Sequence, residues 1–221
     1  MTDDDRPAPF PSSIRKTHMP RLPSLPFDFT ASSEADWRLS ATGVDVTSSP
    51  MTDYFLDPGY TEVTGEYTRL NADTLLAELP EGDFTFTAQV SVDFASDFDA
   101  GVLLLWRDDA HWAKLCFELS REKEPLVVSV VTREYADDAN AFGVEGPTVW
   151  LRAVRMGHII AFHASTDGET WRMVRVFTFG RDLPFTRFGF LAQSPNGQGC
   201  TVRFSHAAFS TDLPADVRAG G

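Results

Sequence analysis

Residues 84–94 read FTFTAQVSVDF, and this stretch decides the fold class of the chain. Its apolar side chains occupy the even positions from Phe84 to Phe94, and its polar side chains occupy the odd positions from Thr85 to Asp93. Successive side chains of a β-strand point to opposite sides of the sheet. The alternation therefore predicts a strand with one buried face and one polar face.

Similar short runs follow along the rest of the chain, at 101–107, 111–119, 126–133, 148–155, 158–165, 171–179, 186–193 and 200–209. Turn-forming residues separate them, as in PEGD at 80–83 and SPNGQG at 194–199. The best helical candidate, Ala72–Leu79, is short and ends at Pro80. About ten to twelve short strands without helices between them predict an all-β jelly roll, a sandwich of two antiparallel sheets, over residues 25–212.

Composition excludes several classes of function. The 221 residues carry a net charge of −13, which opposes binding to nucleic acids and to anionic membranes. No apolar run is long enough to span a membrane, and the acidic start MTDDD does not resemble a secretory signal. Cys116 and Cys200 form no metal or disulfide pattern, so we expect reduced thiols and a cytoplasmic location.

The two ends of the chain differ from its middle. Residues 1–24 contain five prolines among small and polar residues, so we expect an extended arm or a solvated tail there. Residues 213–221 read LPADVRAGG, and we expect them to form a frayed C-terminus.

Three motifs point to a known family. The ending S-x-D-G-x-x-W at Ser165–Trp171 follows a predicted hairpin and resembles the concanavalin A-like lectin and glucanase sandwiches. With HWAKLCFE at 111–118 and SVVTREYADD at 129–138, the sequence resembles DUF1349, a family of uncharacterised concanavalin A-like proteins from bacteria and fungi. The resemblance covers about residues 25–210 and implies the concanavalin A-like fold. The family includes a yeast protein named for regulation of enolase, which makes a metabolic enzyme a possible partner.

The sequence predicts no catalytic residue, metal ligand or cofactor. Retaining glycosidases need two carboxylates about 5–5.5 Å apart, whereas Glu62 and Glu66, or Glu118 and Glu122, would lie about 13 Å apart along a strand. The five histidines lack metal-ligand spacing, and DFASDFD at 93–99 is better explained as a solvated loop than as a calcium site. A glycoside hydrolase whose carboxylates come from neighbouring strands stays open as an alternative.

Strand parity separates inward from outward side chains. In 111–119 the odd positions are mostly apolar and should face the core, and the same rule puts Val174 and Val176 inside but Phe177 outside. Nine residues are predicted to face outward on one concave sheet face: Trp112, Lys114, Glu118, Thr132, Trp150, Arg152, His163, Arg175 and Gln193.

This outward set suits a polyhydroxylated ligand, because aromatic rings pack on C–H faces while polar groups bond hydroxyls. Trp112 and Trp150 would stack on the ligand; Lys114, Arg152 and Arg175 would donate hydrogen bonds. We therefore predict a non-catalytic module that binds a carbohydrate or a small polar metabolite. Two alternatives stay open: an interface with a metabolic enzyme or a second copy in a homodimer, and a purely structural ion-pair network.

Overall fold

The computed structural model describes residues 24–33, 35–59, 68–218 and 220, and all regular structure in these residues is β. None of the described segments forms a helix long and apolar enough to cross a membrane. The strands are β1 (Thr30–Ala31), β2 (Arg38–Leu39), β3 (Gly43–Thr47), β4 (Tyr54–Phe55), β5 (Arg69–Leu70), β6 (Asp73–Glu78), β7 (Phe84–Asp93), β8 (Ala100–Asp108), β9 (His111–Leu119), β10 (Pro125–Arg133), β11 (Asp138–Gly143), β12 (Thr148–Met156), β13 (Ile159–Ser165), β14 (Arg172–Phe177), β15 (Arg187–Gln193) and β16 (Thr201–Ser210).

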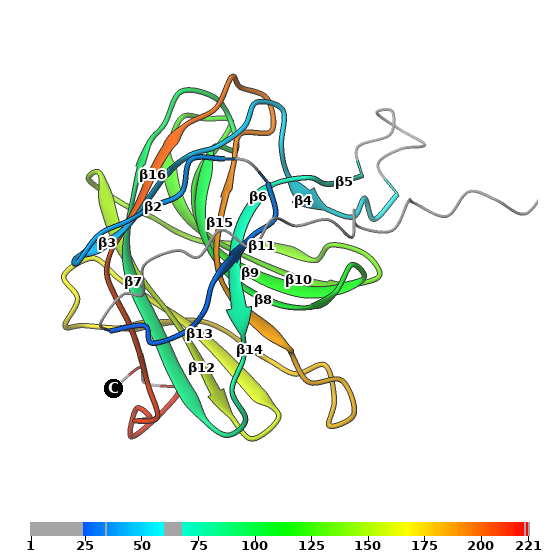
Figure 1. Cartoon of the computed structure of the whole chain (residues 1–221), viewed down its shortest axis with the longest axis vertical. Coiled ribbons are helices and arrows are strands. Elements are labelled where there is room, and N and C mark those ends of the chain that lie inside the picture. Colours follow the sequence, from blue (N-terminus) through cyan, green and yellow to red (C-terminus); the bar gives the residue numbers. More distant parts are fainter. Residues whose placement is uncertain (1–23, 34, 60–67, 219, 221) are drawn as a thin grey trace, which may run out of the picture.

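Two antiparallel sheets of seven strands pack face to face (Figure 1). Sheet I has the order β1-β6-β15-β8-β9-β10-β11, and sheet II has the order β14-β13-β12-β7-β16-β3-β2. The short strands β4 and β5 pair only with each other. This architecture confirms the predicted jelly-roll sandwich. The deciding stretch becomes β7, which lies inside sheet II between β12 and β16 and buries every second residue.

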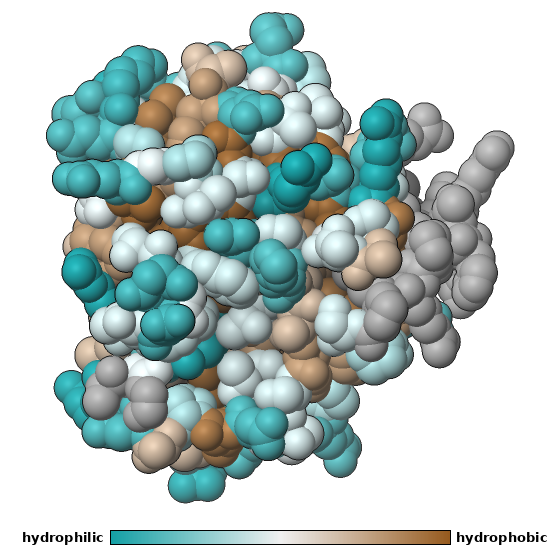
Figure 2. Space-filling view, turned by 90° about the vertical axis from the view of Figure 1, so that its left-hand side faces the viewer, coloured by the Kyte–Doolittle hydropathy of each residue, from teal (hydrophilic) through white to brown (hydrophobic). Residues whose placement is uncertain are grey.

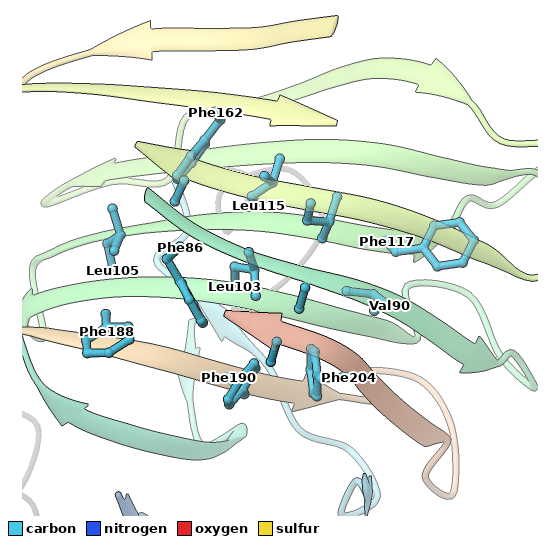
Figure 3. Close-up of a cluster of buried hydrophobic side chains, with 14 of the residues drawn as sticks. Phe86, Val90, Leu103, Leu105, Leu115, Phe117, Phe162, Phe188, Phe190 and Phe204 are labelled. Atoms are coloured by element: carbon cyan, nitrogen blue, oxygen red, sulfur yellow. The ribbon is translucent and has the colours of Figure 1, made fainter. Parts of the chain in front are cut away.

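The main core fills the space between the sheets and is rich in phenylalanine (Figure 3). Phe86 of sheet II meets Phe188 of sheet I edge to face, with ring centroids 5.0 Å apart. Phe190 and Phe204 also meet between the sheets, with tilted rings whose centroids are 4.6 Å apart. Each fully buried phenylalanine side chain contributes about 1.5–3 kcal/mol by leaving water, so these rings are the main force that joins the layers.

The segment Ala72–Leu79, the best helical candidate, contains strand β6. Its neighbours decide the conformation, since β6 pairs with β15 on one side and β1 on the other. Leu75 enters the main core, while Leu76 faces the opposite side of sheet I. Both sides of this strand are covered, which explains why its sequence lacks a clean alternation.

The ends of the sandwich are held by specific contacts. The predicted arm at 1–24 lies outside the described residues except for Ser24, whose hydroxyl donates a hydrogen bond to the Ala207 carbonyl. The C-terminal segment was expected to fray. Instead its Val217 and Gly220 carbonyls accept hydrogen bonds from His163 and Arg152 of sheet II.

On the face shown in Figure 2, hydrophilic residues are spread between small hydrophobic areas, as expected for a strongly acidic chain.

The two sheets approach each other closely at Gly101 in β8. A Cβ atom added there would lie 2.6 Å from a methyl carbon of Val90 and 2.6 Å from one of Val202, both in sheet II. The side chains of Val90 and Val202 cannot move away from an added methyl group, because both are buried in the core. Glycine is therefore required at this point by the spacing of the layers.

We expect Gly101→Ala to lower the free energy of unfolding by about 1–3 kcal/mol, because the added methyl overpacks the core. Urea denaturation followed by tryptophan fluorescence measures the change. Gly143→Ala in β11 is the matched control, since its Cβ would meet no atom closer than 3.9 Å. Equal stability of the two variants would contradict the close approach of the sheets.

Candidate functional site

The nine predicted residues divide between the two sheets. Those on the outer face of sheet I, the face turned away from sheet II, are Trp112, Lys114, Glu118, Thr132 and Gln193. Those on the outer face of sheet II are Trp150, Arg152 and His163. Arg175 lies on the edge strand β14. The predicted convergence on one hollow is therefore wrong, because the two outer faces point away from each other.

Lys114 is the centre of the group on sheet I. Only 2% of it is exposed, and its ammonium Nζ lies 3.3 Å from Asp53 Oδ1 and donates to Gln193 Oε1 at 3.1 Å. The Gln193 amide in turn donates to the Phe98 carbonyl at 3.3 Å. Burial alone would lower the pKa of Lys114, but the nearby carboxylates, Asp53 first, outweigh it and raise the pKa. The buried ammonium is therefore charged.

Asp53 is the partner that the sequence did not reveal. It lies just before β4, is 6% exposed, and is fixed by backbone hydrogen bonds from Asn71 and Ala72 to its carbonyl. These bonds hold the segment around β4 and β5 over the outer face of sheet I. No alternation of polar and apolar residues marks the segment around Asp53. The sequence could have indicated an acidic partner only through Lys114, because a buried lysine requires a nearby anion.

Trp112 and Thr132 form the floor of this face and have no exposed surface. The Tyr54 ring covers Trp112 edge to face at a centroid distance of 5.7 Å, and Trp112 Nε1 donates to the Asp109 carbonyl at 3.1 Å. The Lys114 ammonium lies 5.6 Å from the centroid of the indole. Trp112 thus packs in a second apolar cluster and does not offer an open ring to a ligand.

Glu118 lies at the accessible rim of the same face and is partly exposed. Its neighbours in the register are Ala100 of β8 and Leu126 of β10. Loss of hydration raises its pKa to about 8; Lys114 opposes this rise, whereas Asp53 and Asp138 add to it. Within the described residues its carboxyl group makes no hydrogen bond and no ion pair. It is therefore free to meet a ligand and is mostly protonated at neutral pH.

Arg152 and His163 lie under the C-terminal segment on sheet II. The Arg152 guanidinium lies 4.1 Å from the centroid of the Trp171 ring and donates to the Gly220 carbonyl. His163 Nε2 donates to the Val217 carbonyl at 2.7 Å, and burial lowers the pKa of this histidine. Trp150 lies beside His206, with ring centroids 5.5 Å apart. Arg152 and His163 thus hold the chain's own C-terminal segment, whereas Trp150 contacts His206.

Arg175 joins the edges of the two sheets. A register shift between Phe162 and His163 changes the parity of β14, so Arg175 lies opposite Phe162. Its guanidinium donates to the Asp137 carboxylate at 2.7 Å and to the Asp137 carbonyl at 3.1 Å. The same shift puts Phe177, 9% exposed, into the core. The predicted outward positions of Arg175 and Phe177 are therefore wrong.

Two of the aspartates considered for calcium, Asp97 and Asp99, have partners within the chain. Asp99 accepts hydrogen bonds from the Ala95 and Ser96 amides and from the Ser194 hydroxyl. Asp97 forms an ion pair with Lys123. The described part of the chain has no group of three or more histidine, cysteine, aspartate or glutamate residues that could hold a metal ion. Glu62 and Glu66 lie outside the described residues.

The fold and the sheet topology define the class of protein, a concanavalin A-like sandwich with a covered outer face. The chain belongs to the family described as "Protein of unknown function (DUF1349)", which matches residues 31–212. The resemblance drawn from the sequence motifs is therefore confirmed.

Similar proteins come from yeast and from bacteria. Regulation of enolase protein 1 of Saccharomyces cerevisiae is 30% identical over 131 residues, which cover 58% of this chain and 65% of the yeast protein, just under two thirds of its length. A crystal structure of a functionally unknown protein from S. cerevisiae superposes with a TM-score of 0.74 at 24% identity and covers 84% of this chain and 97% of that one. The xylan β-1,4-xylosidase of Bacillus halodurans shares the fold, with a TM-score of 0.62 at 14% identity over 94% of this chain and 41% of the enzyme.

We expect Glu118→Gln to change how stability depends on pH. Glu118 ionises near pH 4.5 in the unfolded chain and near 8 in the folded protein, so the unfolded state binds fewer protons between these values. Wild-type stability therefore falls as the pH rises through this window and then levels off. The variant lacks this decline, and its Tm should exceed that of the wild type by roughly 5 °C at pH 8.5.

Differential scanning calorimetry from pH 5 to pH 9 measures this difference. Glu122→Gln is the control, because Glu122 is exposed in the turn after β9 and should follow the wild type at every pH. A constant Tm difference between Glu118→Gln and the wild type across the whole range would contradict the raised pKa of Glu118.

Proposed function

We propose that this chain is a non-catalytic binding module that recognises a carbohydrate or a similar hydroxyl-bearing small ligand. The ligand would bind on the outer face of sheet I, at the rim formed by Glu118 and its neighbour Leu126. Asp138 lies beside Val130 on β11, within electrostatic reach of Glu118. One observation carries the proposal: a charged cluster centred on buried Lys114 interrupts an otherwise apolar sheet face, and an unpaired carboxyl group lies beside it.

The energetic cost of this cluster supports a role beyond stability. A buried ion pair contributes little net stability, since removing both charges from water offsets most of their attraction. Apolar residues of similar volume would hold β4 over sheet I at least as well. The chain nevertheless carries Lys114, Asp53 and Gln193 there, all under 7% exposed. A ligand that needs a fixed polar surface would explain why the charges are kept.

The chemistry at the rim favours a neutral ligand rich in hydroxyl groups. A protonated carboxyl group on Glu118 both donates and accepts hydrogen bonds, as the hydroxyls of a sugar require. Asp138 is exposed and adds an acceptor, while partly exposed Leu126 offers an apolar surface for C–H groups. Around Lys114 the carboxyl groups outnumber the ammonium, which disfavours an anionic ligand.

The proposed site uses only part of the residues selected from the sequence. Glu118 would contact the ligand directly, and Lys114 and Gln193 would fix the polar base beneath it. Trp112 and Thr132 would not contact this ligand, because neither has exposed surface and both lie six strand positions, about 20 Å, from Glu118. Trp150, Arg152 and His163 are left out of this site, since they belong to the other sheet.

Isothermal titration calorimetry with a panel of neutral mono- and oligosaccharides tests the proposal. We expect one class of sugar to bind the wild type, and Glu118→Ala to weaken it about tenfold through loss of a hydrogen-bonding carboxyl group. Glu122→Ala, an equal truncation three residues beyond the end of β9, should leave the affinity unchanged. Absence of heat for every sugar, or equal affinities of the two variants, would refute the proposal.

A second candidate function is the regulation of a metabolic enzyme, which the name of the yeast relative favours. The two buried free cysteines are compatible with the reducing cytoplasm, where this chain would bind such an enzyme. Under this hypothesis, purified enolase should bind the immobilised chain with a dissociation constant in the micromolar range or below, as measured by biolayer interferometry. No binding at about 100 μM enolase would remove this candidate.

A further inference from the structure

The outer face of sheet I has a second group of polar and aromatic side chains at its opposite end, around Trp106. Trp106 of β8 lies between Trp112 of β9 and Arg187 of β15 in the strand register. Unlike Trp112, it is partly exposed. The Arg187 guanidinium lies 5.1 Å from the centroid of its ring and forms an ion pair with Glu78 at 3.4 Å.

Three polar atoms at this end are buried and make no hydrogen bond within the part of the chain that the structure describes. They are the indole Nε1 of Trp106, the Oδ1 of Asp109 and the hydroxyl oxygen of Thr132. A buried polar atom without a partner costs about 1–3 kcal/mol, and native proteins contain few of them. One donor, one acceptor and one hydroxyl group, which can do both, are left unpaired in the same region. They leave room for hydrogen bonds to a partner outside the described residues.

Several contacts show that these groups lie near one another. Trp112 Nε1 donates to the Asp109 carbonyl at 3.1 Å, which fixes the turn between β8 and β9 against the face. Thr132 is the register partner of Trp112 on β10. The Tyr54 hydroxyl lies within electrostatic reach of both Asp109 and Arg187, and burial is the main reason for its raised pKa. Tyr54 therefore connects the Asp109 side of the group with the Trp106 and Arg187 side.

We propose that Trp106, Asp109 and Tyr54 form a separate binding site for the hydroxyl groups of a neutral saccharide. Saccharide hydroxyls can accept a hydrogen bond from Trp106 Nε1 and donate one to Asp109 Oδ1, which would satisfy both unpaired atoms. The Arg187 and Glu78 charges balance each other, so Asp109 leaves a negative excess. This excess selects a hydroxyl donor over a carboxylate or a phosphate.

This site is distinct from the proposed rim at Glu118. Trp112 and Glu118 are six positions apart on β9, or about 20 Å at 3.3 Å per residue. Asp53 contacts the face between the two ends, over Lys114. A ligand at Trp106 can therefore bind whether or not the rim at Glu118 binds a sugar.

Two-dimensional 1H–15N NMR of the indole groups tests the proposal, since the chain has five tryptophans and Trp106→Phe identifies the Trp106 signal. Cellobiose, maltose and xylobiose serve as probes, and glucuronic acid serves as the anionic counterpart. We expect at least one neutral disaccharide to shift the Trp106 Nε1–H signal in a saturable manner. Glucuronic acid should bind at least tenfold more weakly.

Variants separate this site from the first one. Asp109→Asn should weaken the response at Trp106 at least tenfold, while Asp182→Asn, an exposed control, should leave it unchanged. Glu118→Ala should also leave it unchanged, so the two proposals can fail independently. The inference is overturned if no disaccharide moves the Trp106 signal, as expected for a site that holds only water, or if Asp109→Asn responds like the wild type.

Discussion

A buried ammonium group on the outer face of sheet I constrains this half of the molecule. Lys114 cannot remain charged in an apolar environment without acceptors, and it obtains them from Asp53 and Gln193. Because Asp53 precedes β4, the ion pair fixes a segment far away in the sequence over the sheet. The position of that segment then determines which residues are covered, such as Trp112, and which remain accessible, such as Glu118. The geometry of the candidate site thus follows from one electrostatic requirement.

The fold was largely predictable because its strongest signal is local. Alternation in β7, β9, β12 and β13 correctly separated core-facing from outward-facing residues. The sheet to which each strand belongs could not be predicted, because strands of both sheets bury every second residue in the same core. Trp112 and Trp150 therefore looked equivalent in sequence although they lie on opposite faces. A register shift beside His163 also changed the side of β14 on which Arg175 lies. No glycine, proline or other turn residue in the sequence indicates this shift.

Both outer faces are covered by segments that belong to neither sheet, but the chemistry of the two covers differs. On sheet I the cover is fixed by a side-chain ion pair between Asp53 and Lys114. On sheet II Arg152 and His163 bind backbone carbonyls of the C-terminal segment. Every residue has a backbone carbonyl, so these hydrogen bonds do not require particular side chains in the C-terminal segment. Arginine and histidine on neighbouring strands are often taken to indicate a ligand site, but here Arg152 and His163 attach part of the same chain.

The contact between Arg175 and Asp137 has a consequence for self-association. Strands β11 and β14 are the edges of their sheets, and an unpaired edge is a template on which another polypeptide can add a strand. Arg175 ties these two edges together, and Arg172 lies 5.0 Å from the Phe142 ring centroid across the same gap. Long charged side chains at an edge also interfere with the flat approach of a foreign strand. The two arginines thus protect this flank of the sandwich against polymerisation into extended sheets.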